Sequence, residues 1–406
     1  MAISGADTAW VLTSAALVML MTPGLGFFYG GMVRQKNALS VVTQCIIIMM
    51  LISVQWVLWG YTLAFGPNVG GIIGGLELLG LQGVGTSASS VYATTIPQLA
   101  FMIYMAMFAI ITPALIVGSF AERVKVSTLV VFVLLWSTLV YDPVAHWVWG
   151  SGGWLKQLGV LDFAGGTVVH ITAGAAALAS VFVIRRRNGY GSVAMEPHNI
   201  PYVVLGTGLL WFGWFGFNAG SALVAGGQAA SAFVATNTAA ASAGLTWMAL
   251  SWKVRGRPSV LGSLAGIVAG LVAVTPAAGF VSPLGAMAIG LVAGVVCYAA
   301  VYWKNTRHFD DSLDVWGVHG IGGTWGALAT GIFASATVGG VNGLIYGNPG
   351  QFGIQLVGVA ATWAYAFVVS LLLFKVLDLT MGWCVTPEEE LVGLDISQHG
   401  EKAYED

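Results

Sequence analysis

Two segments of the sequence each carry a histidine early in a long apolar run, and their layouts are similar. The first is Asp162-Phe163-Ala164-Gly165-Gly166-Thr167-Val168-Val169-His170, and the second is Asp314-Val315-Trp316-Gly317-Val318-His319-Gly320. An ionisable side chain inside a membrane is costly, so it is a candidate for function. Two neutral imidazoles in contact can share a hydrogen bond, one donating and the other accepting. The pair therefore predicts a polar path through an apolar passage.

Other interpretations apply to the same residues. A single histidine on a membrane helix is often a packing residue, and a pair can also ligate a metal or a haem iron. The remaining histidines fall at the ends of apolar runs, in loops or in the tail: His146, His198, His308 and His399. No metal or cofactor is therefore expected. Asp162 and Asp314 are interpreted as N-caps of the histidine helices, with a direct cation ligand as the alternative for Asp162.

A second group of residues falls towards the outer ends of the apolar runs. It combines aromatic side chains with a hydroxyl and an amide: Phe108, Trp149, Phe217, Asn218 and Ser221. Aromatic residues at this depth commonly form interfacial belts. The competing interpretation is a cation site, because each aromatic face attracts a small cation by roughly 0.5–2 kcal/mol and the Ser221 hydroxyl can accept an N–H bond. No carboxylate cage surrounds the group, which disfavours alkali-metal ions.

The composition places these residues in a membrane. Of the 406 residues, 57% are hydrophobic and 8% are charged, whereas a soluble domain averages roughly 25% charged residues. The 56 glycines suit helices that pack closely through small residues. Cys45, Cys297 and Cys384 support neither a disulfide framework nor a thiolate metal site. We therefore expect an all-α, multi-pass integral protein of the cell membrane, with lipid around it and no nucleic-acid partner.

Eleven apolar runs can cross a membrane, at about 20 residues each with some shorter. They cover residues 9–32, 40–65, 97–120, 126–145, 163–184, 201–218, 229–252, 259–276, 284–303, 315–334 and 352–377. Lys and Arg concentrate in alternate connections, which predicts an N-terminus outside and a C-terminus in the cytoplasm. The chain then divides into a transmembrane domain, 1–380, and a cytoplasmic tail, 381–406.

The first ten runs form two blocks of five, about 8–187 and about 199–335, followed by the eleventh at 352–377. An odd number of crossings inverts the second block relative to the first, which is an inverted repeat. His170 and His319 then fall on the fifth span of each block. They approach from opposite faces and can meet near the midplane if both helix starts are set below the surface.

Several motifs resemble the signatures of the ammonium transporter family (Amt/Mep/Rh), and of its prokaryotic Amt branch. They are the first histidine segment, Asp162 to His170, together with Gly317-Val318-His319-Gly320, Thr22-Pro23-Gly24-Leu25-Gly26-Phe27-Phe28-Tyr29-Gly30-Gly31, Gly213-Trp214-Phe215-Gly216-Phe217-Asn218-Ala219-Gly220-Ser221 and the tail motif Gly393-Leu394-Asp395-Ile396-Ser397-Gln398-His399-Gly400-Glu401-Lys402-Ala403-Tyr404. They extend from residue 22 to residue 404, so the resemblance covers nearly the whole chain.

The resemblance implies a role for each of these residues. The external ammonium site would consist of Phe108, Trp149 and Ser221. Phe108 and Phe217 would form a gate below it. His170 and His319 would be the twin histidines of the pore, and Asp162 would support the outer site. The family also implies a homotrimer with one pore per subunit and a cytoplasmic PII-type nitrogen-regulatory partner.

The expected function is ammonium transport. Ammonium would lose its proton near the phenyl gate, because stripping water from the intact ion costs several kcal/mol or more, and ammonia would pass the histidines. The proton either returns outside or crosses separately along the histidines, and we favour the second, electrogenic route. A sensor that signals through the PII-type partner is the alternative. No enzyme is expected, since zinc-ligand spacing, a nucleophile motif and a dinucleotide fingerprint are absent from the sequence.

Overall fold

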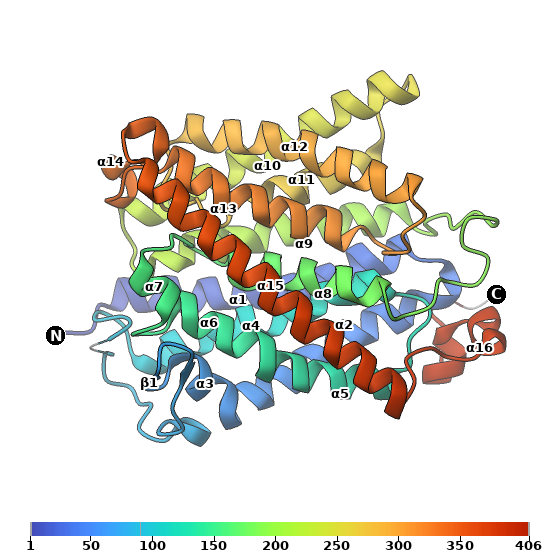
Figure 1. Ribbon diagram of the computed structural model, residues 1–406, viewed down its shortest axis with the longest axis horizontal. Coiled ribbons are helices and arrows are strands. Elements are labelled where there is room, and N and C mark those ends of the chain that lie inside the picture. The colour runs from blue at the N-terminus through green and yellow to red at the C-terminus, as the bar shows by residue number, and fades with distance from the viewer. Residues whose placement is uncertain (1, 90, 405–406) are drawn as a thin grey trace.

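The computed structural model describes residues 2–89 and 91–404, which form a bundle of long helices (Figure 1). Met1 and residues 405–406, the outer limits of the expected domain and tail, lie outside the described residues. The α-helices are α1 Gly5–Met32, α2 Ala38–Gln55, α3 Tyr61–Phe65, α4 Gln98–Phe120, α5 Val126–Trp136, α6 Asp142–Trp149, α7 Trp154–Leu158, α8 Thr172–Val181, α9 Ile200–Ala219, α10 Gly227–Arg255, α11 Val260–Val274, α12 Pro283–Thr306, α13 Ile321–Phe333, α14 Ala336–Gly339, α15 Pro349–Thr380 and α16 Pro387–Val392.

Short helical turns and one hairpin complete the secondary structure. The 3-10 turns are η1 Gln35–Asn37, η3 Leu79–Leu81, η6 Gly220–Ala222 and η8 Leu344–Tyr346. The π-helical turns are η2 Trp56–Gly60, η4 Ser137–Tyr141, η5 Gly166–Ile171, η7 Trp316–Gly320 and η9 Asp395–His399. Strands β1 Asn68–Val69 and β2 Ile73–Gly74 pair antiparallel, with Asn68 opposite Gly74.

Each of the eleven expected apolar runs falls on helical structure. Among the described residues, seven helical segments are long and apolar enough to cross a membrane, and two shorter apolar ones cover Gly166–Val181 and Val260–Val274. The run expected to end at residue 145 continues as helix to Trp149. The π-helical turns η5 and η7 begin the two helices that carry the histidines, and such turns are frequent at functional sites.

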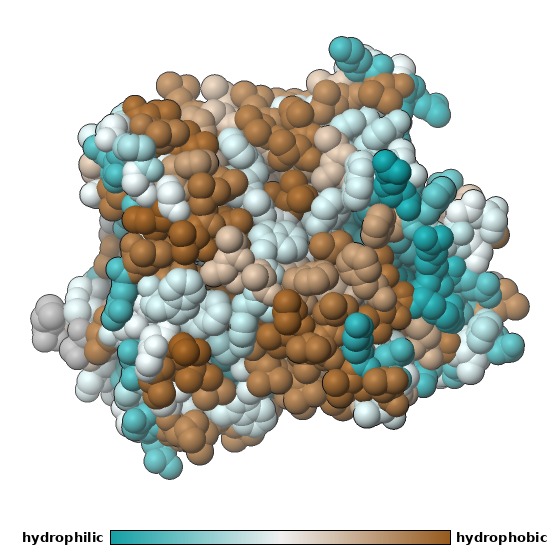
Figure 2. All heavy atoms as spheres, in the orientation of Figure 1, coloured by the Kyte–Doolittle hydropathy of each residue, from teal (hydrophilic) through white to brown (hydrophobic). Residues whose placement is uncertain are grey.

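The surface of the bundle has an apolar middle and polar ends. Figure 2 shows brown side chains across the middle of this face and teal side chains at its ends, most densely at the end that carries α16. Large apolar residues such as Leu284 on α12 and Leu379 on α15 point outward, with 73% and 87% of their surface exposed. Apolar surface of this extent is suited to lipid rather than to water.

Glycines allow α1 and α9 to pack backbone to backbone in antiparallel orientation. A Cβ atom added to Gly206 would lie 2.3 Å from the backbone nitrogen of Phe28, and one added to Gly31 would lie 2.6 Å from the carbonyl oxygen of Asn199. No side chain fits at either crossing, so this small-residue contact sets the helix separation. Because α1 also packs on α4, it aligns α4 and α9, which supply the phenyl rings of the site.

At the end of the bundle that carries α16, buried ion pairs tie the loops together. Glu122 pairs with Arg34 at 3.0 Å and with Arg187 at 3.1 Å, and Arg187 also pairs with Asp310 at 2.6 Å. Burial by itself would raise the pKa of Glu122, but Arg34 and Arg187 outweigh burial and hold that pKa below its ordinary value. The tail packs against the same end, where the Asp395 carboxylate accepts bonds from the first N–H groups of α2.

Candidate functional site

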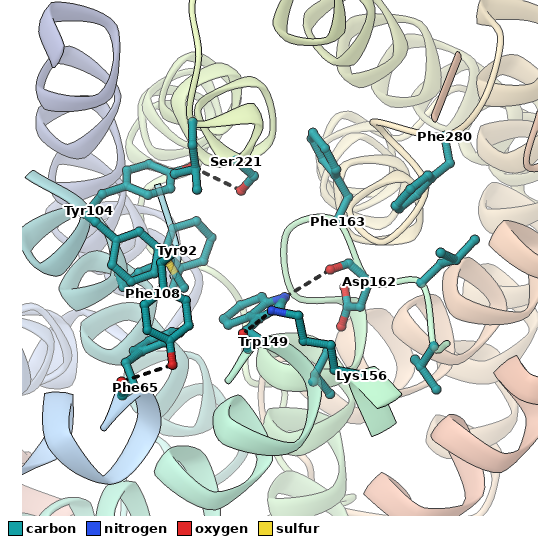
Figure 3. Close-up of a pocket in the computed structure, with 16 residues that line it drawn as sticks. Phe65, Tyr92, Tyr104, Phe108, Trp149, Lys156, Asp162, Phe163, Ser221 and Phe280 are labelled. Carbon is teal, nitrogen blue, oxygen red and sulfur yellow. Dashed lines mark hydrogen bonds between the residues drawn. The ribbon is translucent and has the colours of Figure 1, made fainter. Parts of the chain in front are cut away.

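A cavity of about 270 Å³ lies at the end of the bundle opposite α16. Phe108 from α4, Trp149 at the end of α6 and Ser221 in η6 all line it, so segments far apart in the sequence meet here (Figure 3). The rings of Phe108 and Trp149 meet edge to face, with centroids 5.8 Å apart and planes at 79°. The structure thus brings together the three residues that the sequence analysis grouped as an outer site.

The indole of Trp149 is held by its only polar atom. Its Nε1–H donates to the backbone carbonyl of Asp162 at 3.0 Å. With that donor satisfied, the ring offers the cavity aromatic surface alone, which attracts cations and not anions. The hydrogen bond therefore couples the orientation of Trp149 to the loop that precedes the first histidine helix.

Ser221 is oriented as an acceptor. Its hydroxyl donates to the carbonyl of Phe217 at 2.9 Å, which leaves the oxygen lone pairs available. The Tyr104 hydroxyl lies 3.1 Å from the same oxygen and also contacts the carbonyls of Gly216 and Phe217. Tyr104 was not among the predicted site residues, although it precedes Phe108 by one helical turn and so shares its face.

Asp162 caps the N-terminus of the first histidine helix. Its carboxylate accepts bonds from the backbone N–H groups of Gly165, Gly166 and Thr167 at 2.7–2.8 Å, and from the Thr167 hydroxyl. This geometry matches the capping interpretation. Both oxygens are engaged and the residue is 7% exposed, so Asp162 acts on the cavity through its charge and its backbone rather than as an open ligand.

The capping interpretation of Asp314 is wrong, because Asp311 performs that role. The Asp311 carboxylate accepts bonds from the N–H groups of Val315 and Trp316 at 3.1 and 2.8 Å. Asp314 has a left-handed backbone, with φ of 63°, and its side chain instead pairs with Lys304 of α12 at 2.7 Å. Burial raises the pKa of Asp311 to about 6.

Asn218 does not reach the outer cavity, contrary to the expectation that it belongs to the outer group. It is fully buried, and its side-chain nitrogen donates to the Thr236 hydroxyl of α10 at 3.0 Å. Residues at the end of a helix point in directions 100° apart, so neighbours in sequence separate in space. Asn218 therefore ties α9 to α10, while Phe217 and Ser221 face the site.

Phe108 and Phe217 lie between the outer cavity and a second, much smaller one. Their ring centroids are 4.4 Å apart and their planes are tilted by 45°. Phe108 lines the outer cavity, whereas Phe217 lines the inner one. The two rings therefore lie where the two spaces approach each other.

His170 and His319 meet in the inner cavity, which has a volume of about 10 Å³. Their Nδ1 atoms are 3.3 Å apart, close enough for one ring to donate to the other. His170 also stacks on Trp214, with centroids 5.4 Å apart, and its Nε2 is buried without a hydrogen-bond partner among the described residues. The remaining lining is apolar, comprising Met21, Leu25, Phe28, Ile111, Leu115, Val169, Leu210 and Val268 along with the aromatic rings.

Glycines bring the two histidine helices into contact. A Cβ atom added to Gly174 on α8 would lie 2.2 Å from the Cα of Gly320, and one added to Gly323 on α13 would lie 2.9 Å from the Cβ of His170. The contacts pair residue 166 with 323 and residue 174 with 320, so the segments run antiparallel. This backbone contact is what places two imidazoles from opposite helix directions side by side.

A supporting residue on α15, Gln355, was not predicted from the sequence. The Gln355 side chain accepts from the N–H of Leu161 at 2.7 Å and donates to the Leu161 carbonyl at 2.8 Å. It also donates to the carbonyl of Ala327 on α13 at 2.9 Å. Gln355 thus fastens the residue before Asp162 to the second histidine helix. An amide side chain within the apolar run 352–377 was the signal that the sequence offered.

Comparison with known proteins identifies what the whole chain is similar to. Residues 9–404 match the sequence model of the Ammonium Transporter Family. The chain is 50% identical over 401 residues to ammonium transporter Amt1 of Archaeoglobus fulgidus, which covers 99% of this chain and all of that protein. It is 49% identical to an ammonium transporter of Bacillus subtilis, with 98% of each chain covered.

Solved structures agree with these sequence matches. Saccharomyces cerevisiae Mep2 superposes with a TM-score of 0.92 at 39% identity, covering 100% of this chain and 92% of that one. A structure titled Sensor Amt Protein superposes with a TM-score of 0.89 at 32% identity, covering 97% of this chain and 98% of that one.

Proposed function

Because this chain belongs to the ammonium transporter family and is a multi-pass integral protein of the cell membrane, we propose that it conducts ammonia past paired histidines after deprotonating ammonium at an outer aromatic site. The family consists of transporters rather than enzymes, and its substrate is ammonium. One observation carries the proposed mechanism. An aromatic cavity is separated by two phenyl rings from a narrow apolar cavity that contains His170 and His319.

The outer cavity concentrates ammonium from water. The faces of Phe108 and Trp149 attract the cation, each by roughly 0.5–2 kcal/mol, and Ser221 accepts one of its N–H bonds. Asp162 adds a negative charge behind the Trp149 ring, although hydrogen bonds to the helix start disperse that charge. The bound ion waits above Phe108 and Phe217 until the rings move.

The inner cavity favours ammonia over ammonium. Its volume of about 10 Å³ is near the minimum that holds one small molecule, so the ion would enter without most of its hydration shell. Losing that shell costs several kcal/mol or more, because the apolar walls return few hydrogen bonds. Ammonia is neutral and escapes most of this cost. The ion therefore gives up its proton near the phenyl gate, and the proton passes either to water on the outer side or to the histidine pair, where His170 Nε2 is a nitrogen without a hydrogen-bond partner among the described residues.

The histidine pair offers the proton a separate route. When both rings are neutral, one Nδ1 donates to the other, so the outer nitrogen of one ring is an acceptor and that of the other is a donor. A proton added at one end and released at the other reverses the shared bond. The Nδ1–Nδ1 distance of 3.3 Å permits this exchange. Nitrogen and charge would then enter together, making transport electrogenic.

The same proposal includes a topology. Eleven crossings, with an inverted repeat of spans one to five and six to ten, place the N-terminus outside and the C-terminus in the cytoplasm. The antiparallel contacts of α1 with α9, and of the two histidine segments, support the inverted repeat. The basic residues that gather at the α16 end, including Arg34, Arg185 and Lys36, support its cytoplasmic side by the positive-inside rule.

Family membership also supports a proposal for assembly and regulation. We propose a homotrimer with one pore per subunit, whose cytoplasmic face binds a PII-type nitrogen-regulatory protein. The tail supports a regulated face, since α16 and η9 connect several cytoplasmic loops. Glu390 pairs with Arg185 at 2.7 Å, and Lys36 donates to the carbonyls of Glu390 and Leu391. Light scattering of the purified protein with and without such a partner tests both points.

A sensor role is the second candidate, favoured by the likeness to Sensor Amt Protein. In that case ammonium binding in the outer cavity would alter the tail without sustained flux. Transport and signalling are separated by measuring flux in purified vesicles that contain no partner. A normal binding signal in the absence of flux would favour the sensor.

Current on a solid-supported membrane tests the transport mechanism. Proteoliposomes receive an ammonium pulse, and the same vesicles report internal alkalinisation through a pH dye. Electrogenic transport predicts a saturable positive current that is lost in His170→Ala and His319→Ala. Alkalinisation without current would instead indicate an ammonia channel that returns the proton, and unchanged current in both single variants would remove the histidine relay.

A further inference from the structure

Lys156 on α7 places a fixed ammonium group at the outer cavity. It lines the same cavity as Phe108, Trp149 and Ser221, and its Nζ donates to the Trp149 carbonyl at 2.9 Å (Figure 3). The same Nζ lies 5.9 Å from the centre of the Tyr92 ring, which also lines the cavity. The lysine ammonium group therefore contacts a carbonyl oxygen and an aromatic face, which are the same kinds of group that bind an ammonium ion.

No carboxylate of the described residues neutralises the charge of Lys156 by direct contact. Among residues 2–89 and 91–404, it forms no ion pair. Asp162 is the acidic residue of the cavity lining, but its oxygens are turned to the N–H groups of the helix start. Lys156 is exposed to solvent, so water screens its field without removing it.

We propose that Lys156 sets the affinity of the outer cavity by repelling incoming ammonium. The inference rests on the proposed recruitment of ammonium at this cavity. The aromatic faces and Ser221 attract the cation, whereas the lysine charge opposes it. Their balance determines the ammonium concentration at which the cavity fills. The lysine acts through space on a bound ion and takes no part in the proton transfer.

Two neutral variants and one charged variant of Lys156 separate the effect of its charge from any effect of its hydrogen bond. Lys156→Gln removes the charge and keeps a hydrogen-bond donor, Lys156→Met removes both, and Lys156→Arg keeps the charge. Each is reconstituted into zwitterionic liposomes, and the ammonium concentration that gives half-maximal transport current is measured. We expect about a two- to fivefold lower half-maximal concentration in both neutral variants, and less than a twofold change in Lys156→Arg.

The dependence of the half-maximal concentration on ionic strength is the second readout. Raising the ionic strength from about 10 to 200 mM with the salt of a bulky organic cation shortens the Debye length from about 30 to under 10 Å. The half-maximal concentration of the unmodified protein should fall towards that of Lys156→Gln, while the variant changes little. A positioning role for the lysine would instead raise the half-maximal concentration in Lys156→Met and leave no such salt dependence.

The outcomes distinguish this inference from the proposed function. An unchanged or higher half-maximal concentration in Lys156→Gln, or an equal shift in Lys156→Arg, overturns the role of Lys156 while transport by the unmodified protein stands. If the unmodified protein shows neither current nor alkalinisation, the proposed transport itself fails. A gel-filtration profile matching that of the unmodified protein confirms that each variant is folded.

Discussion

Replacing Asp162 by alanine tests whether the cap holds the outer site and the first histidine helix together. The change removes a carboxylate that accepts three short backbone bonds, at 2.8, 2.7 and 2.8 Å, from Gly165, Gly166 and Thr167. An unsatisfied buried N–H costs about 1–3 kcal/mol. Water entering from the cavity recovers part of this, so we expect the helix start to lose about 3–6 kcal/mol of stability.

Hydrogen–deuterium exchange of the protein in nanodiscs measures this loss where it occurs. For peptides covering residues 163–171, 3–6 kcal/mol corresponds to a loss of protection of about two to four powers of ten. Trp149 should respond as well, because its indole donates to the Asp162 carbonyl. Its fluorescence is therefore expected to change in the variant, and ammonium transport to weaken.

Asp7→Ala is the matched control. Its carboxylate also accepts a backbone bond, from Ala225 at 2.9 Å, but at an exposed position. Exchange at residues 163–171 should be unchanged in this variant. The reasoning is refuted if Asp162→Ala retains protection within a factor of about three, since three unsatisfied N–H groups cannot cost so little. In Asp162→Asn, the loss of exchange protection should fall between those of Asp162→Ala and Asp7→Ala. The asparagine oxygen can still accept N–H bonds, but its amide nitrogen faces other N–H donors.

Three further predictions concern the packing and charges around the site. Gly174→Ala drives a Cβ into the Gly320 backbone, so we expect at least a tenfold loss of transport in vesicles, whereas Ala175→Gly nearby on α8 should retain most of it. Gln355→Leu removes the clamp on the loop before Asp162, which should lower the thermal midpoint by several degrees, and an unchanged midpoint would contradict the clamp. The depressed pKa of Glu122 gives stability that is full above its ordinary value of 4.5 and lost as pH falls below it. Glu122→Gln should therefore lower the thermal midpoint at pH 7 and flatten the decline of that midpoint between about pH 5 and 3. Parallel pH profiles of the variant and the unmodified protein would show that the Glu122–Arg187 pair does not cause the loss of stability in acid.

The outer aromatic group illustrates how much of the site could be predicted. Phe108, Trp149 and Ser221 are separated by dozens of residues, yet Phe108 lies in the outer half of its apolar run and the other two follow the outer ends of theirs. The order of spans therefore places them at one membrane face. The family resemblance singled out these three residues, and the whole-chain match confirms that family. The absence of Asn218 from the cavity depended on its direction around α9, which span boundaries do not resolve.

The two aspartates show why local patterns are insufficient. Asp162 and Asp314 occupy similar places in the sequence, but only Asp162 caps its helix. In the second segment the chain adopts a left-handed conformation at Asp314 and turns that side chain towards Lys304, leaving Asp311 to accept the N–H bonds. A partner on α12 decides this difference, and no pattern around residue 314 contains it.

The sequence by itself determined the class of the protein and its family. Long apolar runs with few charges must satisfy their own backbone groups as helices, because lipid supplies no hydrogen bonds. Tertiary structure decided which groups meet and which way they point. The glycine contact between Gly174 and Gly320 brings His170 within 3.3 Å of His319, and the fold of α7 aims Lys156 at the cavity. Such contacts join residues far apart in the chain, and their directions depend on helix rotation and backbone turns that only the packed bundle defines.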